Sequence, residues 1–184
     1  MSYCKAILKM ERNDRRELHE HYHDFHYGFP LKDDHELFGR LIMEINQAGL
    51  SWETILRKEQ NFRIAFNQFD INKIANYRDT DINRLLSDSG IIRNRKKIEA
   101  VIANAKVVIQ LQQEFGSFDG WLATHHPREK ADWIKLFRKN FKFVGGEIVG
   151  EFLMSIGYLR GAHDEDCPIY NKIMQTSVPW ISKT

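Results

Sequence analysis

The clearest pattern in the sequence lies between residues 37 and 48, where apolar side chains recur every three or four positions. The side chains concerned are Leu37, Phe38, Leu41, Ile42, Ile45 and Ala48. This spacing places them on one face of an α-helix, and the polar run from Asp33 to Glu36 offers side chains that can cap its first turn. The pattern therefore predicts a helix with one face in the protein core.

Helical patterns continue through most of the chain, and the alternation typical of strands is nearly absent. Further helices are predicted over residues 52–66, 70–77 and 79–87, from Ile91 to Gly116, around Trp133, Leu136 and Phe137, and over residues 147–156. Residues 117–128 are predicted to form a loop around a brief turn that carries Trp121 and Leu122. No repeat or low-complexity linker divides the sequence. The predicted fold is all-α, in a single domain over residues 1–184 that has room for two lobes.

The segment from Glu44 to Trp52 is the strongest candidate for chemistry. At about 100° per residue, Glu44 falls about 20° outside the apolar arc of the 37–48 helix, which predicts its carboxylate at the edge of the buried stripe. Ser51 follows the turn residue Gly49 and can cap the next helix, which begins with the large ring of Trp52. An acid and an aromatic surface can thus meet at one corner. The alternatives are that Glu44 reaches solvent or pairs with an arginine, and that Trp52 is a core residue.

The amino-acid composition limits the possible classes of function but does not identify one. The chain has 184 residues, a formal net charge of +2 and a pI near 8.5. This length suffices for one well-buried core, and the weakly basic balance permits a nucleic-acid partner without requiring one. No segment approaches the ~20 apolar residues that a membrane span needs. We expect a cytoplasmic protein that is monomeric and has no membrane partner.

Two basic segments are candidates for contact with phosphates. In the first, Arg93, Arg95, Lys96 and Lys97 crowd the predicted first turns of the long helix. The helix dipole does not favour cations there, so these residues are either a phosphate-binding cluster or a solvated face.

The second basic segment reads K-N-F-K-F-V-G-G from Lys139 to Gly146 and has a helical pattern on either side. A short hairpin between two helices would point free backbone N–H groups outward at a helix N-terminus, an arrangement that suits a phosphate oxygen. The paired glycines Gly145 and Gly146 would let another backbone come close. The alternative is a plain glycine-ended helix hairpin.

The two cysteines, Cys4 and Cys167, lie near opposite ends of the chain. In a reducing compartment they are either buried thiols or shared metal ligands. His163 stands four residues before Cys167, so these side chains are neighbours if the segment is helical. One of the histidines at positions 19, 21, 23 and 26 could complete a tetrahedral zinc site that joins the termini. Exposed or hydrogen-bonded histidines are the alternative.

Four blocks of sequence, taken in order, resemble the 3-methyladenine DNA glycosylase I family of the helix-hairpin-helix superfamily. They read Y-H-D-F-H-Y-G-F-P from Tyr22, E-I-N-Q-A-G-L-S-W from Glu44, G-I-I-R-N-R-K-K-I from Gly90 and F-K-F-V-G from Phe141. A His-x-x-x-Cys pattern follows, and the resemblance extends from Tyr22 to about Cys167. It implies a helical glycosylase fold whose termini are joined by a structural Zn²⁺ site.

The resemblance also implies roles for individual residues. Glu44 matches the pocket glutamate that recognises a flipped base, and is the predicted catalytic residue, while Tyr22 and Trp52 match the aromatic residues that stack on the base. The residues that match the zinc ligands are Cys4, His23, His163 and Cys167. The residues that match the DNA-anchoring hairpin are Val144, Gly145 and Gly146, with Lys142 beside the DNA backbone. Arg93, from the first basic segment, completes the DNA-binding candidates.

The chain departs from the family pattern at several positions. Ala6 stands where a Trp usually follows the first cysteine, His26-Tyr27 stands in place of Glu-Trp, and Asn46 stands in place of Gln. Tyr27 and Asn46 are retained as substrate-binding candidates. The stretch between residues 4 and 23 is longer than usual, and residues 160–162 read R-G-A where many members have Asn-Asp before the histidine. These departures indicate a divergent branch and concern substrate range more than the reaction.

The implied function is repair of alkylated double-stranded DNA. Such an enzyme flips N3-methylated adenine out of the duplex and hydrolyses its N-glycosidic bond. Because the methylated base is cationic and its bond labile, an anionic Glu44 and aromatic neighbours can select it by charge and stacking. No lysine stands at a matching nucleophile position, so we expect an abasic site without strand cleavage. The alternative is a helix-hairpin-helix DNA-binding module without catalytic activity.

Overall fold

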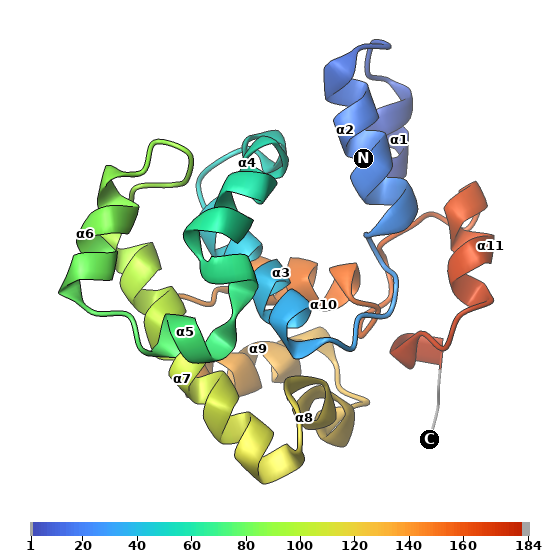
Figure 1. The fold of residues 1–184 in the computed structure, drawn as a ribbon. Coiled ribbons are helices and arrows are strands. Elements are labelled where there is room, and N and C mark those ends of the chain that lie inside the picture. Colours follow the sequence, from blue (N-terminus) through green and yellow to red (C-terminus); the bar gives the residue numbers. More distant parts are fainter. Residues whose placement is uncertain (1, 182–184) are drawn as a thin grey trace.

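The computed structural model describes residues 2–181, and within that range its regular secondary structure is helical throughout (Figure 1). The elements are α1 (Tyr3–Leu8), α2 (Asp14–Phe25), α3 (Asp34–Gln47), α4 (Trp52–Ala65), η1 (Asn67–Phe69), α5 (Ile71–Ala75), α6 (Asp79–Ser87), α7 (Arg95–Phe115), α8 (Phe118–His125), α9 (Lys130–Asn140), α10 (Gly146–Ser155), α11 (Pro168–Met174) and η2 (Pro179–Ile181). The all-α prediction is confirmed. Among the described helices, none is both long and apolar enough to cross a membrane.

Helix α3 is the central element of the fold, because α4, α7, α8, α10 and the turn η1 all pack against it (Figure 1). From Leu37 to Asn46 every residue except Arg40 is buried. A helix that other helices enclose is buried all round, not along one stripe. Glu44 is accordingly more buried than a position at the edge of a single apolar stripe suggests, and its side chain is only 4% exposed. The alternatives that it reaches solvent or pairs with an arginine are wrong, since no ion pair within residues 2–181 involves it.

Close packing against α3 requires glycine at position 39. A Cβ atom there would stand 2.2 Å from the ring of Phe69, which lies flat against the helix backbone. Phe69 ends a turn in which three successive residues have positive φ values of 52°, 56° and 59°, a left-handed conformation that non-glycine residues rarely adopt. The buried ring, with the Arg63 guanidinium 5.0 Å from its centroid, fixes this turn between α4 and α5.

Lys97 closes the carboxyl end of α3. It is buried, and its Nζ donates hydrogen bonds to the carbonyl oxygens of Asn46 and Ala48, each at 2.7 Å. Carbonyls in the last turn of a helix lack internal partners, and a cation satisfies both their hydrogen bonding and the helix dipole. Neither interpretation of the first basic segment, phosphate binding or a solvated face, therefore describes Lys97. Arg93, by contrast, is exposed.

Residues 118–125 form the helix α8, so the predicted loop is wrong at this position. Gly120 lowers the helical propensity of the segment, which hides the helix in the sequence. Three contacts compensate for it. The Ser117 side chain accepts the Gly120 N–H at 2.7 Å, the Asp34 carboxylate of α3 accepts two further backbone N–H groups of the first turn, and Trp121 and Leu122 are buried in the core.

Helices α9 and α10 are joined by the short connection 141–145, as the sequence predicts. Asn104, which is fully buried on α7, fixes the backbone of this connection. Its Oδ1 accepts the Lys142 N–H at 2.7 Å, and its Nδ2 donates to the Lys142 carbonyl oxygen at 3.0 Å. The Lys142 side chain itself is exposed, whereas Val144 is buried, so only the backbone of Val144 can reach a partner.

Candidate functional site

A cavity of about 820 Å³ lies where α2, α3, α4 and α10 meet the N-terminal segment. Its aromatic lining consists of Tyr3, Tyr22, Tyr27 and Trp52, and its acidic lining of Glu44, Glu147 and Glu151. Backbone segments 47–49, 145–146 and 161–162 complete the wall. The sequence-predicted residues Glu44, Trp52, Tyr22 and Tyr27 are thus brought together at one cavity. Aromatic surface with acidic groups suits a flat, positively charged ligand.

Glu44 reaches the cavity from the third turn of α3. Arg40, one turn earlier, donates its hydrogen bond to the Tyr22 hydroxyl at 3.2 Å, and no hydrogen bond among residues 2–181 reaches the Glu44 carboxylate. Burial, reinforced by the negative charge of Glu151 and opposed by Arg40, raises the pKa of Glu44 to about 8. The side chain therefore keeps its proton to a higher pH than an exposed glutamate does. A cation placed beside it would favour the ionised form.

Tyr22 and Trp52 contact each other directly. Their ring centroids are 5.1 Å apart, with the planes inclined at 59°. The contact leaves no space for a planar ligand between the two rings. The Trp52 Nε1–H is buried and has no hydrogen-bond partner among residues 2–181, which is unusual for a buried donor and leaves it available beside the cavity.

Tyr3 is a cavity residue that sequence reasoning missed. Its ring packs edge-on against Tyr27 at 5.6 Å and lies 6.3 Å from Tyr22, measured between centroids. Ala6, which the sequence comparison with the family singles out, is not among the lining residues. The sequence signal that could have identified Tyr3 is its position directly before Cys4, a predicted metal ligand.

Glu151 is the second missed residue. The Tyr27 hydroxyl donates to Glu151 Oε2 at 3.0 Å, which ties an acid on α10 to an aromatic residue that follows α2. The sequence signal that could have identified Glu151 is an acidic residue inside the apolar pattern of residues 147–156, the same kind of signal that identified Glu44.

Asn46 is not brought to the cavity: it is buried, and its Nδ2 donates to the Ile42 carbonyl oxygen at 2.8 Å. Its substrate role stays a prediction, and the neighbouring Gln47 lines the wall instead.

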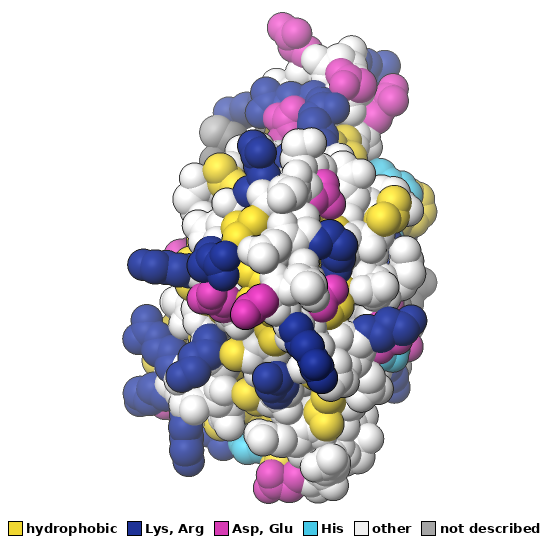
Figure 2. Space-filling view, turned by 60° about the vertical axis from the view of Figure 1, so that its left-hand side comes forward, with side chains coloured by type: hydrophobic (Ala, Val, Ile, Leu, Met, Phe, Trp, Pro, Cys, Tyr) yellow, Lys and Arg dark blue, Asp and Glu magenta, His cyan; other side chains and the backbone are white. Residues whose placement is uncertain are grey.

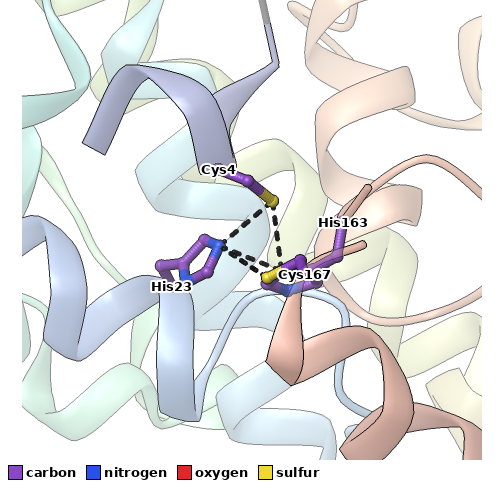
Figure 3. Close-up of side chains that lie close together, drawn as sticks. All are labelled: Cys4, His23, His163 and Cys167. Atoms are coloured by element: carbon purple, nitrogen blue, oxygen red, sulfur yellow. Dashed lines mark hydrogen bonds between the residues drawn. The ribbon is translucent and has the colours of Figure 1, made fainter. Parts of the chain in front are cut away.

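Cys4, His23, His163 and Cys167 form a second cluster, beside the cavity (Figure 3). All four are buried, and their ligand atoms lie within 4.8 Å of one another. His23 Nε2 is 3.2 Å from Cys4 Sγ and 3.0 Å from His163 Nδ1, and Cys167 Sγ is 3.7 Å from His163 Nδ1. A tetrahedral ion with bonds of about 2.0–2.3 Å requires ligand atoms roughly 3.3–3.8 Å apart. The distances in the set lie around this range, so small side-chain shifts would let it hold a metal ion.

Both imidazoles are oriented by hydrogen bonds from their other nitrogen. His23 Nδ1 donates to the Asp24 carboxylate at 2.6 Å, and His163 Nε2 donates to the Tyr27 carbonyl oxygen at 2.7 Å. Such outer hydrogen bonds hold metal-binding histidines in the tautomer that presents the ligand nitrogen. Without a metal, burial raises the pKa of the Cys4 thiol to about 11, whereas a bound metal ion stabilises the thiolate.

Two local arrangements bring these ligands together. Helices α1 and α2 lie side by side, so the long stretch between Cys4 and His23 folds back on itself and returns Cys4 to His23 (Figure 1). Residues 163–167 are not helical, contrary to the condition under which the sequence made His163 and Cys167 neighbours. Cys167 instead caps the start of α11, and a turn brings the two side chains together.

The N-terminus of α10 forms one edge of the cavity. Gly145 is its N-cap and provides no side-chain hydrogen bond, and the first N–H with a helical acceptor is that of Val149, bonded to Gly145 O at 3.0 Å. The N–H groups of residues 146–148 therefore have no acceptor within the helix. Gly145 has an ordinary φ of −92°, and a Cβ atom there would meet nothing within 4 Å. Neither conformation nor packing within the protein requires glycine at this position.

Two predicted DNA-binding side chains are exposed on connections between helices. Lys142 is exposed on the connection before α10, and Arg93 is exposed before α7. Figure 2, which brings the side of the molecule carrying α6 forward, shows Lys and Arg side chains spread over that face, with fewer acidic ones between them. The arrangement is suited to an extended polyanion.

The methyladenine glycosylase family model matches residues 12–134. The chain belongs to this family. It is 36% identical over 168 residues to DNA-3-methyladenine glycosylase 1 of Escherichia coli, covering 81% of this chain and 89% of the relative. It is 35% identical over 166 residues to DNA-3-methyladenine glycosylase of Haemophilus influenzae, covering 80% of this chain and 89% of the relative.

Solved structures of 3-methyladenine DNA glycosylase I share the fold of this family member. The enzyme from Staphylococcus aureus superposes with a TM-score of 0.77 at 31% identity, covering 86% of this chain and 93% of that chain. A tyrosine-to-phenylalanine variant of such an enzyme, in complex with 3-methyladenine, superposes with a TM-score of 0.76, also at 31% identity, covering 86% of this chain and 94% of that chain. The resemblance that the four sequence blocks indicate is thus confirmed.

The burial of Glu44 predicts a measurable cost in stability. Its pKa is about 8 in the folded protein against an ordinary value of 4.5, so the stability that this side chain contributes is fully present below pH 4.5 and is lost as the pH rises through 8. Glu44→Gln removes the titration. The free energy of unfolding of Glu44→Gln should therefore exceed that of the wild type by an increasing margin between pH ~5 and pH ~9, reaching a few kcal/mol.

Urea unfolding at a series of pH values measures this difference. Glu114→Gln, which removes an exposed carboxyl group on α7, is the matched control and should follow the wild type at every pH. Parallel curves for Glu44→Gln and the wild type would show that Glu44 does not titrate in this range.

Proposed function

We propose that this protein excises 3-methyladenine from alkylated double-stranded DNA by hydrolysing the N-glycosidic bond. The observation that carries the proposal is the Glu44 carboxyl group, which is buried, free of hydrogen bonds within the described protein and turned toward an aromatic cavity. Membership of the methyladenine glycosylase family supports it, as do the activities named for the relatives from Escherichia coli and Haemophilus influenzae.

The cavity suits a base that has left the duplex. A base inside a duplex is inaccessible, so the nucleotide must swing out, at a cost of a few kcal/mol for unstacking and unpairing. A cavity of about 820 Å³ is large enough for a purine. The N-terminus of α10 lies on its edge, so a nucleotide whose base enters the cavity brings its phosphates near the free N–H groups of residues 146–148.

Charge explains how such a cavity distinguishes damaged from normal adenine. Methylation at N3 makes the base cationic while it is attached to the sugar, weakens the glycosidic bond and lets the base depart as a neutral molecule. Entry of the cation favours ionisation of Glu44, which then accepts hydrogen bonds from the base. Tyr22 and Trp52 supply stacking and cation-π attraction, and the free Trp52 Nε1–H is a further donor. Normal adenine carries no charge and gains little from these groups.

The product of the reaction is an abasic site in an uncut strand. Enzymes that cut the strand use an amine to form a Schiff base with the sugar, and no lysine within the described range 2–181 lines the cavity. Water is then the nucleophile, and the labile bond needs little acid catalysis.

Release of 3-methyladenine from methylated duplex DNA tests this function. The wild type should release the base, identified by chromatography and mass spectrometry, and leave strands that break only after alkali. Glu44→Gln should release it at least about tenfold more slowly because the ionisable partner of the base is lost. If the folded wild type released no base yet bound duplex DNA, the alternative of a DNA-binding module without catalysis would replace this proposal.

We also propose that Cys4, His23, His163 and Cys167 bind a structural Zn²⁺ ion. The distances within the set and the hydrogen bonds that orient both imidazoles support this assignment. A bound zinc ion would join the N-terminal and C-terminal segments, and four protein ligands leave no position for a reactive water. His23 and His163 also help to position the cavity wall. Tyr22, a lining residue, directly precedes His23 in the chain, and the carbonyl of Tyr27, another lining residue, accepts the His163 Nε2 proton.

His23→Ala tests the zinc assignment. The wild type should contain one zinc ion per chain by elemental analysis, and His23→Ala should lose it together with several kcal/mol of stability, because binding and folding are coupled. His21→Ala, which removes an exposed histidine two residues earlier on α2, is the control and should keep both. Wild-type protein that is fully stable without stoichiometric zinc would refute the assignment.

We propose that the N-terminus of α10 and the preceding connection anchor the DNA backbone. The glycine at position 145 supports this, because nothing within the protein requires it while a closely approaching phosphate would. Backbone N–H groups of residues 146–148 and the exposed side chains of Lys142 and Arg93 supply the attraction. These contacts carry no sequence information, which suits a repair enzyme that meets damage in any context.

Lys142→Ala should weaken binding to undamaged duplexes of any sequence and lower the slope of log affinity against log salt concentration by about 1. Lys135→Ala is the control, because Lys135 lies on α9 and is already paired with Asp132 at 2.9 Å. Fluorescence anisotropy at several salt concentrations measures both. A salt dependence that is the same for Lys142→Ala and the wild type would remove this connection from the DNA interface.

A further inference from the structure

Glu151 faces the cavity from α10 and is held in place by Tyr27. The Tyr27 hydroxyl donates to Glu151 Oε2 at 3.0 Å. Tyr27 cannot easily move: it is 7% exposed, its N–H donates to the Tyr22 carbonyl at 2.9 Å, and its carbonyl accepts the His163 Nε2 proton at 2.7 Å. Glu151 thus has one oxygen tied to a fixed hydroxyl, and no hydrogen bond among the described residues engages the other oxygen.

Two carboxyl groups therefore share one cavity, and they are not equivalent. Glu44 is enclosed on the central helix and receives no hydrogen bond from the described part of the chain, and burial with the nearby negative charge raises its pKa to about 8. Glu151 is only half-buried, and its carboxylate accepts the Tyr27 hydroxyl proton at one oxygen, which leaves the other oxygen for a ligand in the cavity.

We propose that Glu151 is a specificity-determining residue that selects positively charged alkylated purines, and that Tyr27 is its positioning residue. The inference rests on the proposed function and adds a second recognition group to the same cavity. A cationic base replaces the water around the carboxylate with an opposite charge. Binding of a neutral base displaces the same water but supplies no positive charge. The cost of desolvating the carboxylate is then not offset, and the neutral base binds more weakly.

Binding of two small probes tests the proposal without requiring catalysis. The first is the 3,9-dimethyladeninium cation, in which a methyl group replaces the sugar of the damaged nucleoside. The second is 9-methyladenine, which is neutral and nearly the same shape. Their dissociation constants can be measured at neutral pH by quenching of tryptophan fluorescence, since Trp52 lines the cavity. The variants compared with the wild type are Glu151→Gln, Tyr27→Phe and Glu114→Gln.

Glu151→Gln should weaken binding of the cation about tenfold and leave binding of the neutral probe unchanged or slightly tighter. Tyr27→Phe keeps the ring and removes the hydroxyl, so it should lose part of the preference for the cation, by a factor of a few. Glu114→Gln removes a carboxylate of equal charge from outside the cavity lining and should behave as the wild type.

Three results would overturn the proposal. Equal losses for both probes in Glu151→Gln would indicate a role in the shape of the cavity and not in charge selection. Unchanged binding of both probes would show that Glu151 does not contact the ligand. A wild type that binds neither probe would remove the cavity as a purine site. A wild type that prefers the cation but releases no base from DNA would refute the proposed function alone and leave the charge selection by Glu151 standing.

Discussion

The cavity depends on the contact between the two ends of the chain at the cysteine and histidine cluster. Ser2 and Tyr3, which come just before Cys4, line the cavity, as do Tyr22 before His23 and residues 161–162 before His163. Three of the four clustered residues thus have immediate neighbours in the wall. Cys4 and Cys167 belong to a small hydrophobic cluster of their own, whereas Tyr22 and Tyr27 belong to the main core around α3. The proposed zinc ion would therefore tie the two ends of the chain to segments that carry cavity residues.

The second constraint is the placement of an ionisable acid on the most enclosed helix. A buried carboxyl group without a partner costs stability, which the large apolar core around α3 offsets. Lys97 contributes by holding the carbonyls of Asn46 and Ala48, which fixes the course of residues 47–49 along the cavity wall.

The sequence predicted well those features that depend on neighbours in the chain. Apolar spacing identified α3, α4, α7 and α10, and the resemblance to the family selected His23 from four candidate histidines, which spacing alone left open. What it missed depends on distant partners. Lys97 lies among cations but turns inward to a helix fifty residues away, and α8 exists because Asp34 and the core stabilise a segment of low propensity. Glu151 becomes a candidate site residue only through its hydrogen bond with Tyr27, which lies in the connection after α2 and far from Glu151 in the sequence.

Asn104 holds the connection before α10 by hydrogen bonds with the backbone N–H and carbonyl oxygen of Lys142, and the lysine side chain takes no part in this contact. The shape of this edge is therefore set by a buried amide, while its charge is set by an exposed residue that can change independently. Under the proposed DNA-binding role of Lys142, substitution at this position would tune how tightly and how long the protein stays on undamaged DNA, with no compensating change in the core. A repair enzyme that must survey long stretches of duplex and still let go gains from that separation.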